Sequence, residues 1–157
     1  MNILDAYSKK VINALNFNHV EYLIVGGYAV NYYGYKRTTG DIDIWIKPEN
    51  TINKQFLIQA LLELDIDEES IEYLKGLDFT KPVVFMDGDD PFKIDFMTHL
   101  AGKVSFEEAY KLKTIQFYDE VQLPFIHYKH LIESKITSNR LKDKLDIETL
   151  QKINQNK

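Results

Sequence analysis

The chain has 157 residues, a net charge of −5 and no cysteine, and 45% of its residues are hydrophobic. These values suit a single globular domain with a sizeable core, and they exclude disulfides and thiolate metal sites. The acidic balance does not favour a general nucleic-acid-binding surface. No apolar run approaches a membrane-spanning length and the N-terminus lacks a signal-peptide core, so we expect a cytoplasmic protein with no membrane partner.

The first elements are a helix, a buried strand and a second helix. Apolar residues at helical spacing predict an amphipathic helix over Leu4–Phe17, and the run Leu23–Val25 predicts a buried strand. Gly26 and Gly27 follow this strand and precede a short helical pattern over Tyr28–Tyr33. Glycines let the backbone approach a ligand closely, and the start of a helix favours an anion. The turn is therefore a candidate anion cradle.

A basic turn, Lys36–Gly40, leads into a predicted strand over Asp41–Ile46 that alternates strictly. Side chains two apart on a strand share a face. One face carries Ile42, Ile44 and Ile46, and the other carries Asp41, Asp43 and Trp45. Two neighbouring carboxylates repel each other unless a cation lies between them, and hard cations such as Mg²⁺ prefer carboxylate oxygens. The sequence thus predicts a metal site beside the anion cradle, while Trp45 is expected to pack in the core.

A third carboxylate lies in a later predicted strand. Phe92–Met97 alternates, so Asp95 shares a face with Lys93 and Met97, opposite the apolar face of Ile94 and Phe96. A carboxylate in the middle of a strand is unusual unless it faces a site. An exposed strand aspartate is the alternative interpretation.

The remaining elements are predicted from periodicity, turn residues and caps. A capping box marks the helix that begins after Ser105, and Pro124 is expected to end the last strand. We expect helices at Thr51–Leu64, from Asp67, at Ser105–Leu112, at His130–Thr137 and at Leu141–Ile153, and strands at Val83–Met86, Thr114–Tyr118 and Val121–Leu123, with a turn at Asp87–Pro91.

The ordered pattern G-G-x-A…G-x-x-R-x-T-x-D-I-D-I over Val25–Ile46 resembles the nucleotidyltransferase superfamily, which shares its fold with DNA polymerase beta. The Gly-Gly version with Arg-x-Thr is most similar to the bacterial group of AbiEii-type toxins and small antibiotic nucleotidyltransferases. The resemblance implies an α/β (α+β) fold with a mixed central sheet flanked by helices. It also implies one nucleotidyltransferase domain over residues 1–157, with a helical tail at about 127–157.

The resemblance assigns roles to the acidic residues. Asp41 and Asp43 would hold a nucleotide-bound metal, and both together with Asp95 would hold a catalytic metal. The implied cofactors are two Mg²⁺ ions, with Mn²⁺ as a substitute. Asp95, near the attacking oxygen, is also the candidate general base. We expect the three carboxylates to converge.

Nucleotide-binding residues follow from the same resemblance. The Gly26–Gly27 amides would bind the triphosphate, Arg37 would neutralise phosphate charge, and Thr39 would brace the loop. Many relatives have serine where this chain has Gly27, so the amides must bind phosphate without a hydroxyl. The tail is similar to a K-x4-R-x-K-D-x2-D pattern that makes Lys135 a phosphate-binding candidate, although a solvated helix lysine is the alternative. Arg140, Asp143 and Asp146 are expected to form an ion network.

The predicted function is metal-dependent transfer of a nucleoside monophosphate from a nucleoside triphosphate to an acceptor hydroxyl. The acceptor stays open between a small molecule, an RNA 3′ end and a protein, although the charge does not favour nucleic acid. A different class of function is a non-catalytic, partner-binding module of a toxin–antitoxin pair. Intact Asp41, Asp43 and Asp95 favour the enzyme.

Overall fold

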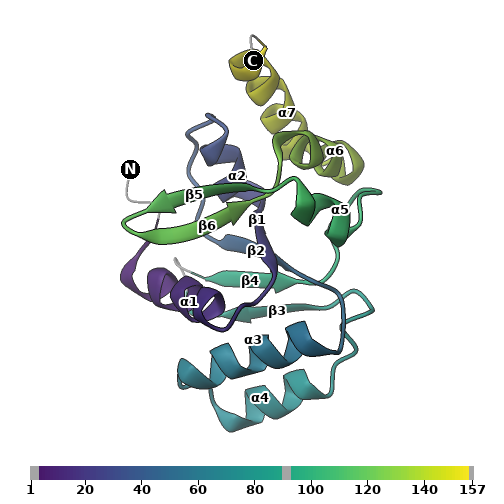
Figure 1. The fold of residues 1–157 in the computed structure, drawn as a ribbon. Helices are drawn as coiled ribbons and strands as arrows, with labels where there is room; N and C mark the ends of the chain where they lie inside the picture. Colours follow the sequence, from purple (N-terminus) through teal and green to yellow (C-terminus); the bar gives the residue numbers. More distant parts are fainter. Residues whose placement is uncertain (1–3, 90–92, 156–157) are drawn as a thin grey trace.

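The structure is a computed structural model that describes residues 4–89 and 93–155, and it is a mixed α/β architecture (Figure 1). No helix in these two ranges is both long and apolar enough to cross a membrane. The helices are α1 (Ala6–Phe17), α2 (Gly26–Tyr32), α3 (Ile52–Glu63), α4 (Glu68–Lys75), α5 (Phe106–Lys111), α6 (Tyr128–Ser138) and α7 (Leu141–Asn154). The strands are β1 (Tyr22–Val25), β2 (Ile42–Ile46), β3 (Val84–Asp87), β4 (Ile94–Met97), β5 (Thr114–Tyr118) and β6 (Val121–Phe125).

The strands form one mixed sheet in the order β3-β4-β2-β1-β6-β5. The β2–β4 and β1–β6 pairs are parallel, and the other neighbours are antiparallel. This confirms the predicted mixed central sheet flanked by helices. It leaves β3 and β5 as the two edge strands, and it places the two acidic strands side by side.

One face of the sheet packs on α1, α3 and α4 and forms the main core. Ile42, Ile44 and Ile46 are completely buried there, as the alternation predicts. Tyr7 of α1 donates a hydrogen bond of 2.6 Å to Asp87 at the end of β3, and Phe85 faces a cavity under α4. Burying side chains of this size supplies most of the stability of such a layer.

The opposite face carries Trp45 and the acidic residues, and α5 covers part of it. Trp45 is buried, its Nε1 donates to the carbonyl of Thr98 at 3.0 Å, and its ring meets Phe106 of α5 edge-on at 5.3 Å. This confirms the prediction that Trp45 packs in the core. Figure 1 shows α5 and α6 on the same side of the sheet, with α7 projecting away from it.

Some element boundaries differ from the predictions. The strand β6 continues through Pro124, which lies opposite Ile115 of β5, so the prediction that Pro124 ends the strand was wrong. Pro124 is tolerated because β6 meets β1 only at Phe125, so its missing N–H interrupts no ladder at that position. Helix α6 begins before His130, since His127 caps it by accepting from the Lys129 amide at 3.0 Å. The end of the predicted turn at Asp90–Pro91, and Phe92, lie outside the described residues.

Candidate active site

Four side chains form a row across four strands on the face that α5 and α6 partly cover. Met86 of β3 pairs with Asp95 of β4, Asp95 pairs with Asp43 of β2, and Asp43 pairs with Val25 of β1. Paired residues in adjacent strands lie on the same face. This cross-strand row places the two strand carboxylates next to each other and ends at the turn that begins with Gly26.

The carboxylates open into a polar pocket of about 370 Å³. The pocket brings together most of the residues singled out in the sequence, because the Lys36–Gly40 turn folds back over the start of β2. Its lining consists of Gly27, Arg37, Thr38, Thr39, Gly40, Asp41, Asp43, Asp95, Arg140 and Lys142. The expected convergence of Asp41, Asp43 and Asp95 on one pocket is therefore present.

The acidic residues of the pocket disfavour one another's charge. Burial, followed by the charges of Asp95 and Asp41, raises the pKa of Asp43 to about 6, against the opposing effect of Lys142 and Lys135. Burial and the charge of Asp41 also raise the pKa of Asp95. Perturbed carboxylates in a pocket are typical of functional sites.

The donor set suits a hard divalent cation. Oδ1 of Asp95 is buried without a hydrogen-bond partner, although buried carboxylate oxygens normally have one. Among the residues that the structure describes, no group of three or more histidine, cysteine, aspartate or glutamate side chains is already arranged to hold a metal ion. The fit therefore rests on chemistry: three crowded carboxylates, one with an unpartnered oxygen, are the ligands that Mg²⁺ and Mn²⁺ prefer.

The two glycines of the turn are required by close contacts. Gly26 has φ of +63°, and a Cβ atom there would overlap Oδ2 of Asp43. A Cβ atom on Gly27 would overlap Oγ1 of Thr39 and lie 3.4 Å from Nη1 of Arg37. The turn can thus lie against both the acidic strand and the basic loop only because it carries no side chains.

Asn31 of α2 ties this turn to the loop, and it was not among the residues predicted from the sequence. Its Nδ2 donates to the carbonyls of Gly27 and Arg37, both at 3.0 Å, and the side chain is buried. The carbonyl of Asn31 in turn accepts from Nζ of Lys36 at 2.8 Å. A buried asparagine at helical spacing from a glycine turn was the available signal.

The C-terminal helices add a charged network to the pocket wall. Nε and Nη2 of Arg37 donate to the carboxylate of Asp146 at 2.8 and 3.0 Å, and Nζ of Lys135 lies 3.0 Å from the same carboxylate. Lys135 also donates to Asp143 at 3.3 Å. Lys135 is therefore a buried link between two aspartates rather than a solvated helix lysine.

Arg140 and Lys142 complete the wall at the turn between α6 and α7. Nε of Arg140 donates to Asp143 at 2.8 Å, and hydrogen bonding to Asp143 raises the Arg140 pKa. These bonds form the expected ion network of the tail. The position of Arg140 and Lys142 in the polar pocket, however, was not predicted, because spacing along a helix does not say which face meets the sheet.

A second, half-apolar pocket of about 260 Å³ adjoins the polar one, and Asp43 and Arg140 line both. Its walls come from the turn after β1, the end of β4 and the inner face of α6. The other lining residues are Val25, Gly26, Met97, Leu100, Ala101, Leu131, Ser134, Lys135, Ser138 and Asp143.

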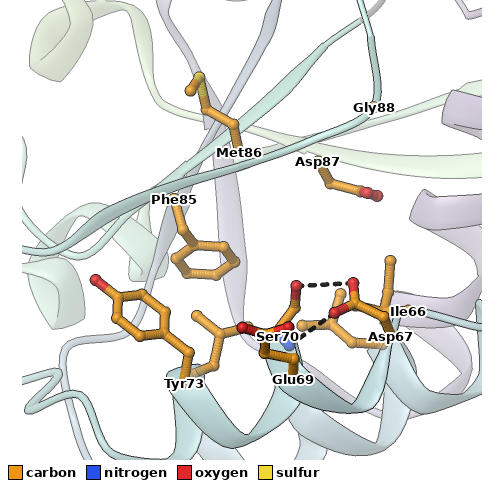
Figure 2. Close-up of a pocket in the computed structure, with 11 residues that line it drawn as sticks. Ile66, Asp67, Glu69, Ser70, Tyr73, Phe85, Met86, Asp87 and Gly88 are labelled. Carbon is orange, nitrogen blue, oxygen red and sulfur yellow. Dashed lines mark hydrogen bonds between the residues drawn. The ribbon is translucent and has the colours of Figure 1, made fainter.

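A larger cavity of about 560 Å³ lies between α4 and β3, on the sheet face that does not carry the acidic residues (Figure 2). Tyr73, Ser70 and Phe85 surround it, and Asp67 there caps α4 by accepting from Ser70. Met86 points away from these side chains, on the other side of the strand. The cavity thus contains none of the carboxylates of the polar pocket.

Comparisons with known proteins identify the fold. No family model matches the chain, and no curated protein sequence matches it. Among solved structures, the chain is similar to the lincosamide antibiotic adenylyltransferase LnuA in its lincomycin-bound form, with a TM-score of 0.52 and 15% identity. The match covers 91% of this chain and 93% of that one. At this identity the likeness concerns the fold alone, so the chain has a nucleotidyltransferase-like fold.

Proposed function

We propose that the protein is a metal-dependent nucleotidyltransferase that moves a nucleoside monophosphate from a nucleoside triphosphate to an acceptor hydroxyl. The observation that carries the proposal is the polar pocket, in which three carboxylates and the cations of the loop and tail surround one glycine turn. In a purely structural cluster each carboxylate oxygen would pair with a neighbouring cation or hydrogen-bond donor, whereas here Asp95 retains an unpartnered buried oxygen.

The triphosphate would occupy the polar pocket. Arg37, Arg140 and Lys142 supply positive charge there, and Gly27 allows the phosphates to approach the backbone. Thr39 would brace the loop, since its Oγ1 lies next to Gly27. Lys135 contributes through its position next to Asp43, whose pKa its charge lowers.

The half-apolar pocket would hold the nucleoside. Met97, Leu100 and Leu131 offer apolar surface for a base, and Ser134 and Ser138 offer hydroxyls for its polar edge or the ribose. Because Asp43 and Arg140 line both pockets, a nucleotide that spans them would present its α-phosphate to the carboxylates.

Asp41 and Asp43 would hold the metal that accompanies the nucleotide, and Asp95 would join them at a second ion. Bound metal would neutralise the charge on the attacking and leaving oxygens. Asp95 would accept the proton of the acceptor hydroxyl on Oδ1. The acceptor oxygen then forms a bond to the α-phosphorus, and the bond from that phosphorus to pyrophosphate breaks.

The fold similarity to LnuA, together with the Gly-Gly and Arg-x-Thr motif of this chain, supports a place among the small antibiotic nucleotidyltransferases and AbiEii-type toxins. A toxin–antitoxin partner module without turnover is the alternative. It would bind nucleotide or a protein partner but would release no pyrophosphate.

The test combines binding with turnover on the same samples. The melting temperature is measured with each of the four nucleoside triphosphates in the presence of Mg²⁺ or Mn²⁺, and at least one nucleotide should raise it. Pyrophosphate release in the presence of cell extract should accompany that shift and disappear in Asp43→Asn and Asp95→Asn. Asp119→Asn is the matched control. Asp119 is an exposed aspartate in the β5–β6 turn that pairs with Lys9 of α1. No shift at millimolar nucleotide and no pyrophosphate release would contradict the proposal.

A further inference from the structure

The cross-strand row has a direction. It runs from Val25, next to the Gly26 turn, through Asp43 and Asp95 to Met86. Met86 lies in the edge strand β3, and the side chain two residues earlier on the same face is Val84. Both are exposed, Met86 at 63% and Val84 at 70%. We call this pair the β3 ledge.

The two arginines that line the polar pocket lie toward the other end of the row. Arg37 and Arg140 line the polar pocket together with Gly27, and the tail that carries Arg140 reaches the sheet beside Gly26. The triphosphate, and with it the leaving pyrophosphate, belongs at that end. Attack on phosphorus proceeds roughly in line with the leaving group. The attacking oxygen therefore enters from the opposite end, over Asp95 and toward the β3 ledge.

We propose that the acceptor is a small molecule whose apolar body rests on Met86 and Val84 while its hydroxyl reaches Asp95. This inference rests on the proposed function and names the acceptor class for the same site. An apolar body is favoured because burying the exposed thioether and isopropyl groups gains free energy in proportion to the area covered. The unbranched Met86 side chain adapts to irregular apolar shapes.

Charge at this end of the row does not suit a polynucleotide. Binding RNA requires several phosphate contacts from lysine and arginine. Lys93 lies near Asp95 at this end and lowers the Asp95 pKa, while β3 ends in the carboxylate of Asp87. Figure 2 shows that Met86 and Phe85 lie on opposite sides of β3, so the Met86 side chain lies on the face of its partner Asp95, while the residue also borders the cavity under α4.

The first experiment asks which class of molecule receives the label. The full chain is incubated with Mg²⁺, each nucleoside triphosphate labelled at the α-phosphate, and cell extract separated into small-molecule, RNA and protein pools. We expect label in the small-molecule pool and not in the other two. Label in the RNA or protein pool, together with pyrophosphate release, would overturn the acceptor assignment alone. Absence of pyrophosphate release with every pool would instead count against the proposed function on which it rests.

The second experiment uses the ledge itself. Met86→Ser and Val84→Ser should each raise the acceptor pool concentration needed for half-maximal transfer at least tenfold, and leave the Mg²⁺-nucleotide melting shift unchanged. Phe117→Ser is the matched control, because Phe117 is an equally exposed apolar residue on the other edge strand, β5. Its transfer should match that of the unaltered protein. Normal acceptor dependence in both ledge variants would overturn the inference.

Discussion

Arg37 donates two hydrogen bonds to Asp146, which lies 109 positions later in the chain. The pair joins the loop before β2 to the last helix. Because Nε and Nη2 are bound to Asp146, Nη1 of Arg37 is the nitrogen that lies near Gly27. Asp146 thus orients the arginine that faces the proposed phosphate end of the polar pocket, and two-point binding of this kind fixes a guanidinium more firmly than a single bond.

Replacing Asp146 with Asn should weaken nucleotide binding and destabilise the fold together. The variant leaves Arg37 and the buried Lys135 with one carboxylate fewer, and breaking a buried ion pair in this way costs about 3 kcal/mol. Urea unfolding measures this cost, and nucleotide KM should rise while kcat changes less. Lys152→Gln, which breaks the exposed pair with Glu148, should change stability by less than about 0.5 kcal/mol. An unchanged KM in the Asp146 variant would show that Arg37 needs no such support.

Replacing Asp43 with Asn should stabilise the metal-free protein while abolishing transfer. The raised pKa of Asp43, about 6, means that the folded state holds its proton more tightly than the unfolded chain does. The stability of the unaltered protein therefore falls as pH rises from about 4 to about 6. Above that window the ionised carboxylate is a net cost, which we place at about 2 kcal/mol after allowance for partial exposure.

The measurement is chemical unfolding in EDTA across this pH range. The two proteins should have similar stability at pH 4, and the Asn variant should be the more stable one at pH 8. With Mg²⁺ and nucleotide present the order should reverse, because only the unaltered protein gains binding energy. A destabilised Asp43→Asn that still transfers nucleotide would contradict the assignment of Asp43.

Adding one methyl group at Gly26 should disrupt the site. Alanine there must adopt a left-handed conformation, and its Cβ atom would overlap the Asp43 carboxylate. The two effects together should cost about 2 kcal/mol or more in unfolding free energy and abolish the nucleotide-induced melting shift. Gly76→Ala is the control, since Gly76 has φ of −81° and its nearest atoms lie 3.6 Å from an added Cβ. That change should be neutral or stabilise the protein by up to about 1 kcal/mol.

Replacing Lys142 tests whether the positively charged pocket wall binds nucleotide, and it should do so without changing the stability of the fold. It is exposed and lines the polar pocket, and its charge lowers the Asp43 pKa. Lys142→Gln should raise nucleotide KM severalfold with no change in melting temperature, because loss of an exposed charge rarely alters stability. Lys144→Gln removes an exposed lysine two residues further along the same helix and should leave KM unchanged. Equal effects of the two variants would point to net charge rather than to position.

The acidic part of the site could be predicted because strand alternation is a strictly local property. Asp43 and Asp95 have apolar neighbours on either side, and period two alone assigns their faces, whereas Asp41 lies just before β2. The register that sets Asp43 beside Asp95 joins strands 52 residues apart, and alternation leaves it open. Predicting that Asp43 lies beside Asp95 would have required knowing that β4 pairs with β3 on one side and in parallel with β2 on the other.

The basic part of the site was harder to predict because it depends on how helices pack. Lys142 and Lys144 look alike in the sequence, and only the docking of α7 brings Lys142 to the polar pocket. Asn31 shows the same limit, since its two bonds join carbonyls that become neighbours only when the loop closes. Pro124 was misjudged because its effect depends on which strand its missing N–H would have met.

The ion pair of Arg37 with Asp146 also has a consequence for the order in which the protein matures. The sheet is complete once Phe125 has been placed, but Lys135, Arg140 and Asp146 are still to come. All the sheet strands, with Asp43, Asp95 and Arg37, therefore leave the ribosome before the tail residues that line the pocket. On the proposed function, a chain arrested on the ribosome before α7 emerges would lack Arg140, Lys142 and Asp146 and should bind a triphosphate weakly, so activity would require the docking of the last helix.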